Sequence, residues 1–101
     1  MRGPFFLLKF AANPRRSTYR VAVVVSRKVS KSAVVRNRIR RRLYAAVRIL
    51  QDDIGRPHDI VLSVFDVKLL EESPKQLARL VKKQLIAAGI LENYTRPAED
   101  E

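Results

Sequence analysis

The 101-residue sequence has no cysteine, only three glycines and no long apolar run. Without cysteine there is no disulfide framework, no thiol nucleophile and no cysteine-ligated zinc or iron–sulfur site. None of the glycines forms a glycine-rich phosphate loop. No apolar run approaches the roughly 18–20 residues that a membrane span needs. We therefore expect a soluble, cytoplasmic protein with no membrane partner.

Acidic residues are missing from the first half of the chain. All 10 Asp and Glu lie from Asp52 onward, whereas 14 of the 21 Lys and Arg lie between Met1 and Gln51. Surfaces of soluble domains usually mix both signs of charge. A half-chain with cations alone, in a protein of net charge +11, indicates a polyanionic partner.

Three strands are expected, at residues 5–10, 18–26 and 59–65, where aliphatic and aromatic residues cluster. The turn signal at Asn13-Pro14 suggests that the first two strands pair as an antiparallel hairpin. A helix precedes the third strand, which allows that strand to run parallel to one of the hairpin strands.

Two helices are expected, from Ser32 to Leu50 and from Ser73 to Ala88, with Gly89 ending the second. Apolar residues recur on one face of each helix. The predicted stripes are Ile39, Leu43, Ala46, Val47 and Leu50, and then Leu77, Leu80, Val81, Leu85 and Ala88. The element order predicts an α+β fold, a small two-layer sandwich with helices packed on one sheet.

The first predicted helix has a broad cationic back. Like charges four residues apart, such as Arg36 and Arg40, cost about 0.2–0.5 kcal/mol per pair, and bound phosphates would relieve that repulsion. Guanidinium groups bind phosphate with two hydrogen bonds. The amide of Asn37 can read a base edge, bind a sugar hydroxyl or order neighbouring arginines. The RNA-binding candidates are Arg27, Lys28, Lys31, Arg36, Asn37, Arg38, Arg40, Arg41, Arg42 and Arg48.

The central segment resembles the motif of the bacterial ribonuclease P protein. In that family a strand ends in Ser-Lys-Lys, a loop follows, and a helix carries Arg-Asn-Arg. Here Ser26-Arg27-Lys28 is followed by Ala33 to Arg41, which contains Arg36-Asn37-Arg38. The resemblance covers roughly Phe5 to Gly89, and the ordered strand, loop and helix are more specific than the tripeptide alone.

The resemblance implies a non-catalytic subunit of a ribonucleoprotein endonuclease. A catalytic RNA, with magnesium ions that it mainly holds itself, removes the 5′ leader of precursor tRNA. The protein lays its arginine-rich helix on that RNA and holds the leader in a cleft on the sheet. A left-handed strand–helix–strand crossover is implied as well. Phe6 and Lys9 are the candidates for the leader cleft, with a plain core role for Phe6 as an equal alternative.

Three departures from the family pattern stand out. Family members begin with an extra helix that forms one wall of the cleft, and we expect that helix to be absent here, so that the leader site is open, rebuilt or completed by another chain. Arg42-Leu43-Tyr44-Ala45 replaces an apolar residue followed by Arg-Glu. Residues 1–95 are expected to form one RNA-binding domain, and residues 96–101 an acidic, disordered tail rather than a basic one.

Other readings are open. A structural RNA-binding protein, such as a small ribosomal protein, shares the charge and size. A duplex-DNA binder or a membrane-surface helix fits less well, because the arginines leave few side chains to read bases and the apolar stripe is narrow. His58 and Asp52-Asp53 are set aside as catalytic or metal-binding groups, since neither has suitable companions. The oligomeric state is left open.

We predict that affinity for structured RNA falls steeply with salt, because neutralised phosphates release counterions. Filter binding across a salt series measures the slope. An affinity that does not change with salt would rule out binding through phosphates.

Overall fold

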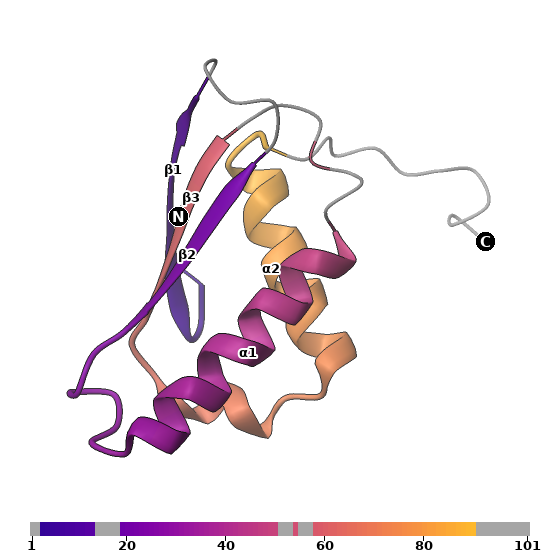
Figure 1. Cartoon of the computed structure of the whole chain (residues 1–101). Helices are drawn as coiled ribbons and strands as arrows, with labels where there is room; N and C mark the ends of the chain where they lie inside the picture. The colour runs from indigo at the N-terminus through magenta and orange to yellow at the C-terminus, as the bar shows by residue number, and fades with distance from the viewer. Residues whose placement is uncertain (1–2, 14–18, 51–53, 55–57, 91–101) are drawn as a thin grey trace.

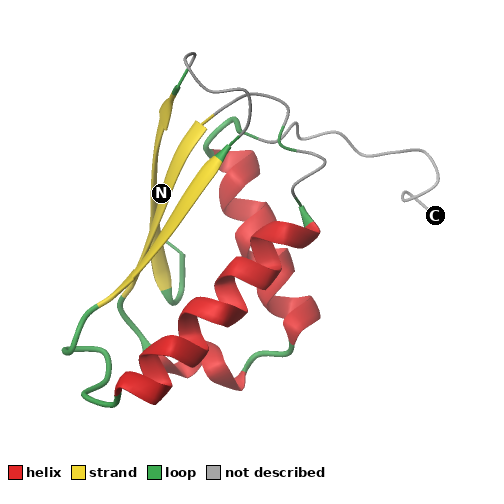
Figure 2. Cartoon of the chain, in the orientation of Figure 1, coloured by secondary structure: helices red, strands yellow, loops and turns green. Residues whose placement is uncertain are grey.

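The computed structural model describes residues 3–13, 19–50, 54 and 58–90. The elements follow the order β1 (Phe6–Ala12), β2 (Arg20–Val25), α1 (Ala33–Ile49), β3 (His58–Val64), the 3-10 helix η2 (Val67–Glu71) and α2 (Pro74–Ala87). The strands form one sheet, and both α-helices lie on the same side of it, as Figures 1 and 2 show. The predicted α+β two-layer fold is confirmed, and η2 is an element that the sequence did not predict. The predicted acidic tail lies outside the described residues.

The sheet order is β1-β3-β2, so β1 and β2 are not neighbours. β3 pairs antiparallel with β1, with Phe6 opposite Val64, and parallel with β2, with Val25 opposite Val64. The predicted hairpin of the first two strands is therefore wrong, whereas the predicted parallel pairing of the third strand is confirmed. β3 is the central strand of the sheet. Every one of its residues is buried or half-buried, which suits a strand with neighbours at both edges.

The connection from β2 to β3 runs through α1 on the helix side of the sheet. In Figure 1 the chain descends β2, ascends α1 and then descends β3, which lies behind β2. This path is the left-handed strand–helix–strand crossover that the resemblance implied. Such crossovers are rare, because a right-handed strand twist favours the opposite sense. The crossover presents α1 along the β2 edge of the sheet.

α2 has the ends that its sequence predicts. The Ser73 hydroxyl caps its first turn, and Gly89 follows its last turn with a φ of 81°. The N–H of Gly89 donates to the Ile86 carbonyl at 3.0 Å, and the N–H of Ile90 donates to the Leu85 carbonyl at 2.9 Å. These two bonds form a Schellman motif, whose left-handed residue favours glycine because glycine has no Cβ.

A single core fills the space between the sheet and the helices. All five residues of the predicted stripe of α1 are buried. In α2 the stripe is shifted slightly: Leu80 and Ala88 are only half-buried, and Ala78 and Gln84 are buried instead. The strands contribute Phe6, Leu8, Val23, Val25, Ile60, Leu62 and Val64.

Phe6 belongs to this core, so its prediction as a leader-cleft residue is wrong. Its side chain is 0% exposed, and so is that of Leu8, two residues along β1 on the same face. A ring without exposed surface cannot stack on a nucleotide base. The alternative that the sequence left open, a plain core role, is the one that the structure supports.

Phe6→Ala should lower the free energy of unfolding by about 3–5 kcal/mol, because it leaves a cavity against the helices. Urea denaturation followed by circular dichroism measures this. Lys9→Ala, at an exposed position of the same strand, is the matched control and should change stability by less than about 0.5 kcal/mol. A Phe6→Ala protein of unchanged stability would contradict the core assignment.

Candidate RNA-binding site

The loop between β2 and α1 presents three of the predicted cations. The N–H of Val29 donates to the Ser26 carbonyl at 3.1 Å, which closes a turn, and the Ser26 hydroxyl accepts from the N–H of Lys28 at 3.3 Å. The side chains of Arg27, Lys28 and Lys31 on this loop are exposed.

The first turn of α1 is held to that loop. The Ser32 hydroxyl caps the helix by accepting from the N–H of Val35 at 3.2 Å. The half-buried Arg36 guanidinium donates to the Ser30 carbonyl at 2.9 Å. No acidic residue lies in this turn, so the positive end of the helix dipole stays available to an anion.

Further along α1, the predicted residues differ in exposure. Arg40 and Arg42 are half-buried, and Arg42 donates to the Glu72 carbonyl at 2.8 Å, which ties α1 to the segment before α2. The exposed members of the predicted set on the helix are Asn37, Arg38, Arg41 and Arg48. Two kinds of arginine are therefore distinct: Arg36 and Arg42 also hold the fold, whereas Arg38, Arg41 and Arg48 are exposed.

Together, these loop and helix residues are called the α1 surface: Arg27, Lys28, Lys31, Arg36, Asn37, Arg38, Arg40, Arg41, Arg42 and Arg48. Within the described part of the chain, the one ion pair recorded joins Arg20 to Asp59, away from this surface. No described carboxylate thus lies within bonding distance of its cations. Their charge is not neutralised by the protein and is available to a polyanion.

Tyr44 lies in the segment where this sequence departs from the family pattern, and its hydroxyl contacts β2. Its hydroxyl accepts a hydrogen bond from the N–H of Val23 at 3.2 Å. β2 is an edge strand, so this N–H has no strand partner on that side. The bond satisfies the Val23 N–H at the edge of β2 and joins α1 to that strand. This contact could not be predicted from the sequence, because it joins residues far apart in the chain.

Lys9 lies on the other face of the sheet from the α1 surface. Residues opposite one another in the register share a face, so Lys9 shares its face with Val61, and Ala22, paired with Val61 from β2, does too. Both helices lie on the opposite side. This open face is made by Leu7, Lys9, Ala11, Arg20, Ala22, Val24, Asp59, Val61 and Ser63. The structure thus separates Lys9 from both Phe6 and α1.

A polar cluster lies at one end of the open face. Arg20 donates from Nε and one terminal nitrogen to the two carboxylate oxygens of Asp59, each at 3.3 Å, and the amide of Asn13 donates to Asp59 at 3.0 Å. At the other end Leu7 and Val24 flank Ser63, and Val24 is 50% exposed. This face could not be predicted from the sequence, because the strand order decides which residues share it.

His58, Asp52 and Asp53 were not expected to be catalytic or metal-binding groups. His58 is the first residue of β3, and its ring centroid lies 6.4 Å from that of Phe10. Asp52 and Asp53 lie outside the described residues. Among the residues that the structure describes, no three His, Asp or Glu side chains gather as metal ligands. No helix there is long and apolar enough to cross a membrane.

Known proteins share both sequence and fold with this chain. The ribonuclease P protein component of Rippkaea orientalis is 39% identical over 85 residues, which are 84% of this chain and 65% of that protein. The component of Roseiflexus castenholzii is 36% identical over 95 residues, 94% of this chain and 77% of that protein. The chain therefore spans just under two thirds of the first relative.

Solved structures of low sequence identity show the same fold. The ribonuclease P protein of Staphylococcus aureus aligns with a TM-score of 0.75 at 20% identity, over 91% of this chain and 82% of that one. The Thermotoga maritima protein aligns with a TM-score of 0.74 at 20% identity, over 84% and 78%. The family model for ribonuclease P matches residues 1–89. The chain belongs to the ribonuclease P protein family.

Proposed function

We propose that this protein is the protein subunit of ribonuclease P, which binds the catalytic RNA and assists removal of the 5′ leader from precursor tRNA. The observation that carries the proposal is the α1 surface, a run of cations without carboxylate partners in the described chain. Family membership gives the partner, and the charge gives the means of binding. Relatives named as ribonuclease P protein components favour this over a ribosomal role. Both RNAs are cytoplasmic, so we expect the protein in that compartment.

The α1 surface would act on the RNA as a rigid array of charge. Ser32 and Arg36 fix the start of the helix to its loop, and Tyr44 fixes the helix to the sheet. A helix held in this way presents its cations to phosphates without first having to fold, so that more of the electrostatic gain appears as affinity. The same neutralisation replaces part of the counterion atmosphere that the RNA otherwise draws from magnesium.

The open face would receive the single-stranded leader. Lys9 offers one cation to a phosphate, and the exposed apolar residue Val24 offers a surface for a base or a sugar. Because Phe6 faces the helices, no stacking by that ring is part of the proposal. The leader and the catalytic RNA would then contact opposite layers of the protein.

Magnesium in this proposal belongs to the RNA, where it supplies the hydrolytic chemistry. The α1 surface does not fit a divalent cation, because its side chains are cationic or, in Asn37, neutral. The protein residues therefore bind and position RNA and take no part in bond cleavage.

The two kinds of arginine on α1 give a test of the site. Arg38→Ala and Arg41→Ala should each weaken RNA binding about three- to tenfold, as expected when a phosphate contact is lost, with little change in Tm. Arg36→Ala and Arg42→Ala should also lower Tm by several degrees, since each loses a hydrogen bond to a backbone carbonyl worth about 1 kcal/mol. Filter binding and thermal denaturation measure both. Equal losses of Tm in all four variants would show that the exposed arginines are structural.

The proposed function itself is tested by precursor-tRNA cleavage with a bacterial ribonuclease P RNA at low magnesium. We expect the protein to stimulate cleavage and the Arg38→Ala/Arg41→Ala variant to lose most of that stimulation, because phosphate neutralisation matters most when divalent ions are scarce. Lys68→Ala, an exposed cation on η2, is the control and should stimulate like the wild type. A folded wild type that binds structured RNA yet gives no stimulation would favour a purely structural RNA-binding role.

A further inference from the structure

α2 carries a second cationic surface that is separate from α1. Lys75, Arg79, Lys82 and Lys83 are all exposed, and their spacing of three and four residues places them on the solvent side of the helix. The buried residues of α2 lie on its other side and are Leu77, Ala78, Val81, Gln84 and Leu85. The helix is therefore anchored by one face and leaves a cationic face open.

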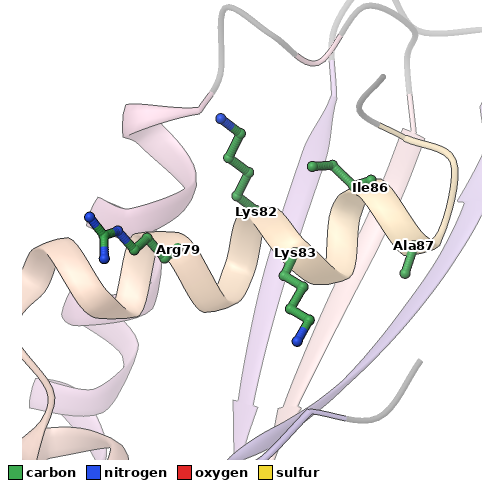
Figure 3. A pocket seen from close by; sticks show the side chains of 5 residues that line it. All are labelled: Arg79, Lys82, Lys83, Ile86 and Ala87. Atoms are coloured by element: carbon green, nitrogen blue, oxygen red, sulfur yellow. The ribbon is translucent and has the colours of Figure 1, made fainter. Parts of the chain in front are cut away.

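The last turns of this face border a hollow. Its lining residues are Arg79, Lys82, Lys83, Ile86 and Ala87. In Figure 3 the side chains of Lys82 and Lys83 extend to opposite sides of α2, with Ile86 and Ala87 one turn further along. The hollow is thus bordered by separated cations and by two apolar side chains. These residues, together with Lys75, are called the α2 surface.

The charges of the α2 surface are not balanced within the described chain. The ion pair recorded there joins Arg20 to Asp59 and involves no residue of α2. Lys75 and Arg79, and then Arg79 and Lys83, are like charges four residues apart, which costs about 0.2–0.5 kcal/mol per pair. As on α1, an anionic ligand would relieve this repulsion.

The composition of the α2 surface favours nucleic acid over a protein partner. Protein interfaces are typically centred on aromatic or large apolar anchors, whereas the apolar part here is the half-buried Ile86 and the small Ala87. Interfaces with nucleic acids are strongly cationic. Three of the four cations are lysines, which act as point charges and suit phosphates better than base edges.

We propose that the α2 surface is a second phosphate-binding surface, which takes a segment of RNA backbone independently of base sequence. Arg79, Lys82 and Lys83 would bind phosphate oxygens, and Ile86 would contact a ribose. α1 and α2 lie side by side over one face of the sheet, so the surface extends the contact with RNA onto a neighbouring helix. The inference rests on the proposed function for the identity of the polyanion.

The test compares two variants that lose the same charge. Lys82→Gln/Lys83→Gln lowers the net charge by two on the α2 surface, and Lys68→Glu lowers it by two on η2. Affinity of the full chain for a bacterial ribonuclease P RNA is measured by filter binding across a salt series, and folding is checked by thermal denaturation. The α2 variant should bind roughly tenfold more weakly near physiological salt, and the slope of log affinity against log salt should be shallower by about 2. The Lys68→Glu variant should stay within about twofold of the wild type.

Three results would overturn the inference, and they are distinguishable from one another. If the wild type binds with a steep salt slope and the α2 variant matches it, the α2 surface is not an RNA contact, although the proposed function stands. If the wild type itself binds without salt dependence, the proposed function and this inference fail together. Equal losses in the α2 and η2 variants would show an effect of net charge alone and would likewise overturn the assignment of a site.

Discussion

The rest of the structure depends on the burial of one narrow apolar stripe of α1. The helix holds its cations close together without acidic partners among the described residues, so their repulsion opposes its folding in isolation. Ile39, Leu43 and Val47 are almost fully buried against the sheet and α2, and this burial offsets the repulsion. A domain of this size can therefore keep a dense array of positive charge in a fixed arrangement. Both the α1 surface and the crossover that positions it require this packing.

Three hydrogen bonds fix the position of α1 within the fold. Arg36 joins α1 to the loop before it, Arg42 joins it to the segment before α2, and Tyr44 joins it to the edge of β2. Each bond joins α1 to a different part of the fold. Two of them use arginines that also belong to the α1 surface. The fold therefore shares Arg36 and Arg42 with the proposed RNA contact, whereas Arg38 and Arg41 are exposed.

The helices were predictable because their determinants are local. Ser32, Ser73 and Gly89 mark helix ends within a few residues of sequence, and the buried stripe of α1 follows from its period alone. The sheet was less predictable because its pairing is not local. Asn13-Pro14 favours a hairpin, yet the buried third strand comes between the first two. Residues 5–8 are all apolar, so alternation could not tell which face Phe6 takes.

The candidate site was predictable in composition but not in its internal division. Charge and spacing identify the whole α1 surface, since residues 27–48 contain many cations and no acidic residue. They cannot tell Arg36 and Arg42 from Arg38 and Arg41, because that distinction depends on carbonyl groups brought close by folding. The open face and the α2 surface depend in the same way on which side of each element the core occupies.

The central position of β3 has a consequence for how the chain folds. β1 and β2 both pair only with β3, and Phe6 meets Val64 across the sheet. During synthesis neither strand has its partner until the chain has grown through β3, because the pairing spans most of the domain. Long-range pairing of this kind raises contact order and slows folding. A nascent chain therefore exposes two unpaired apolar strand segments and the arginine-rich segment of α1 before it has a sheet against which they can pack.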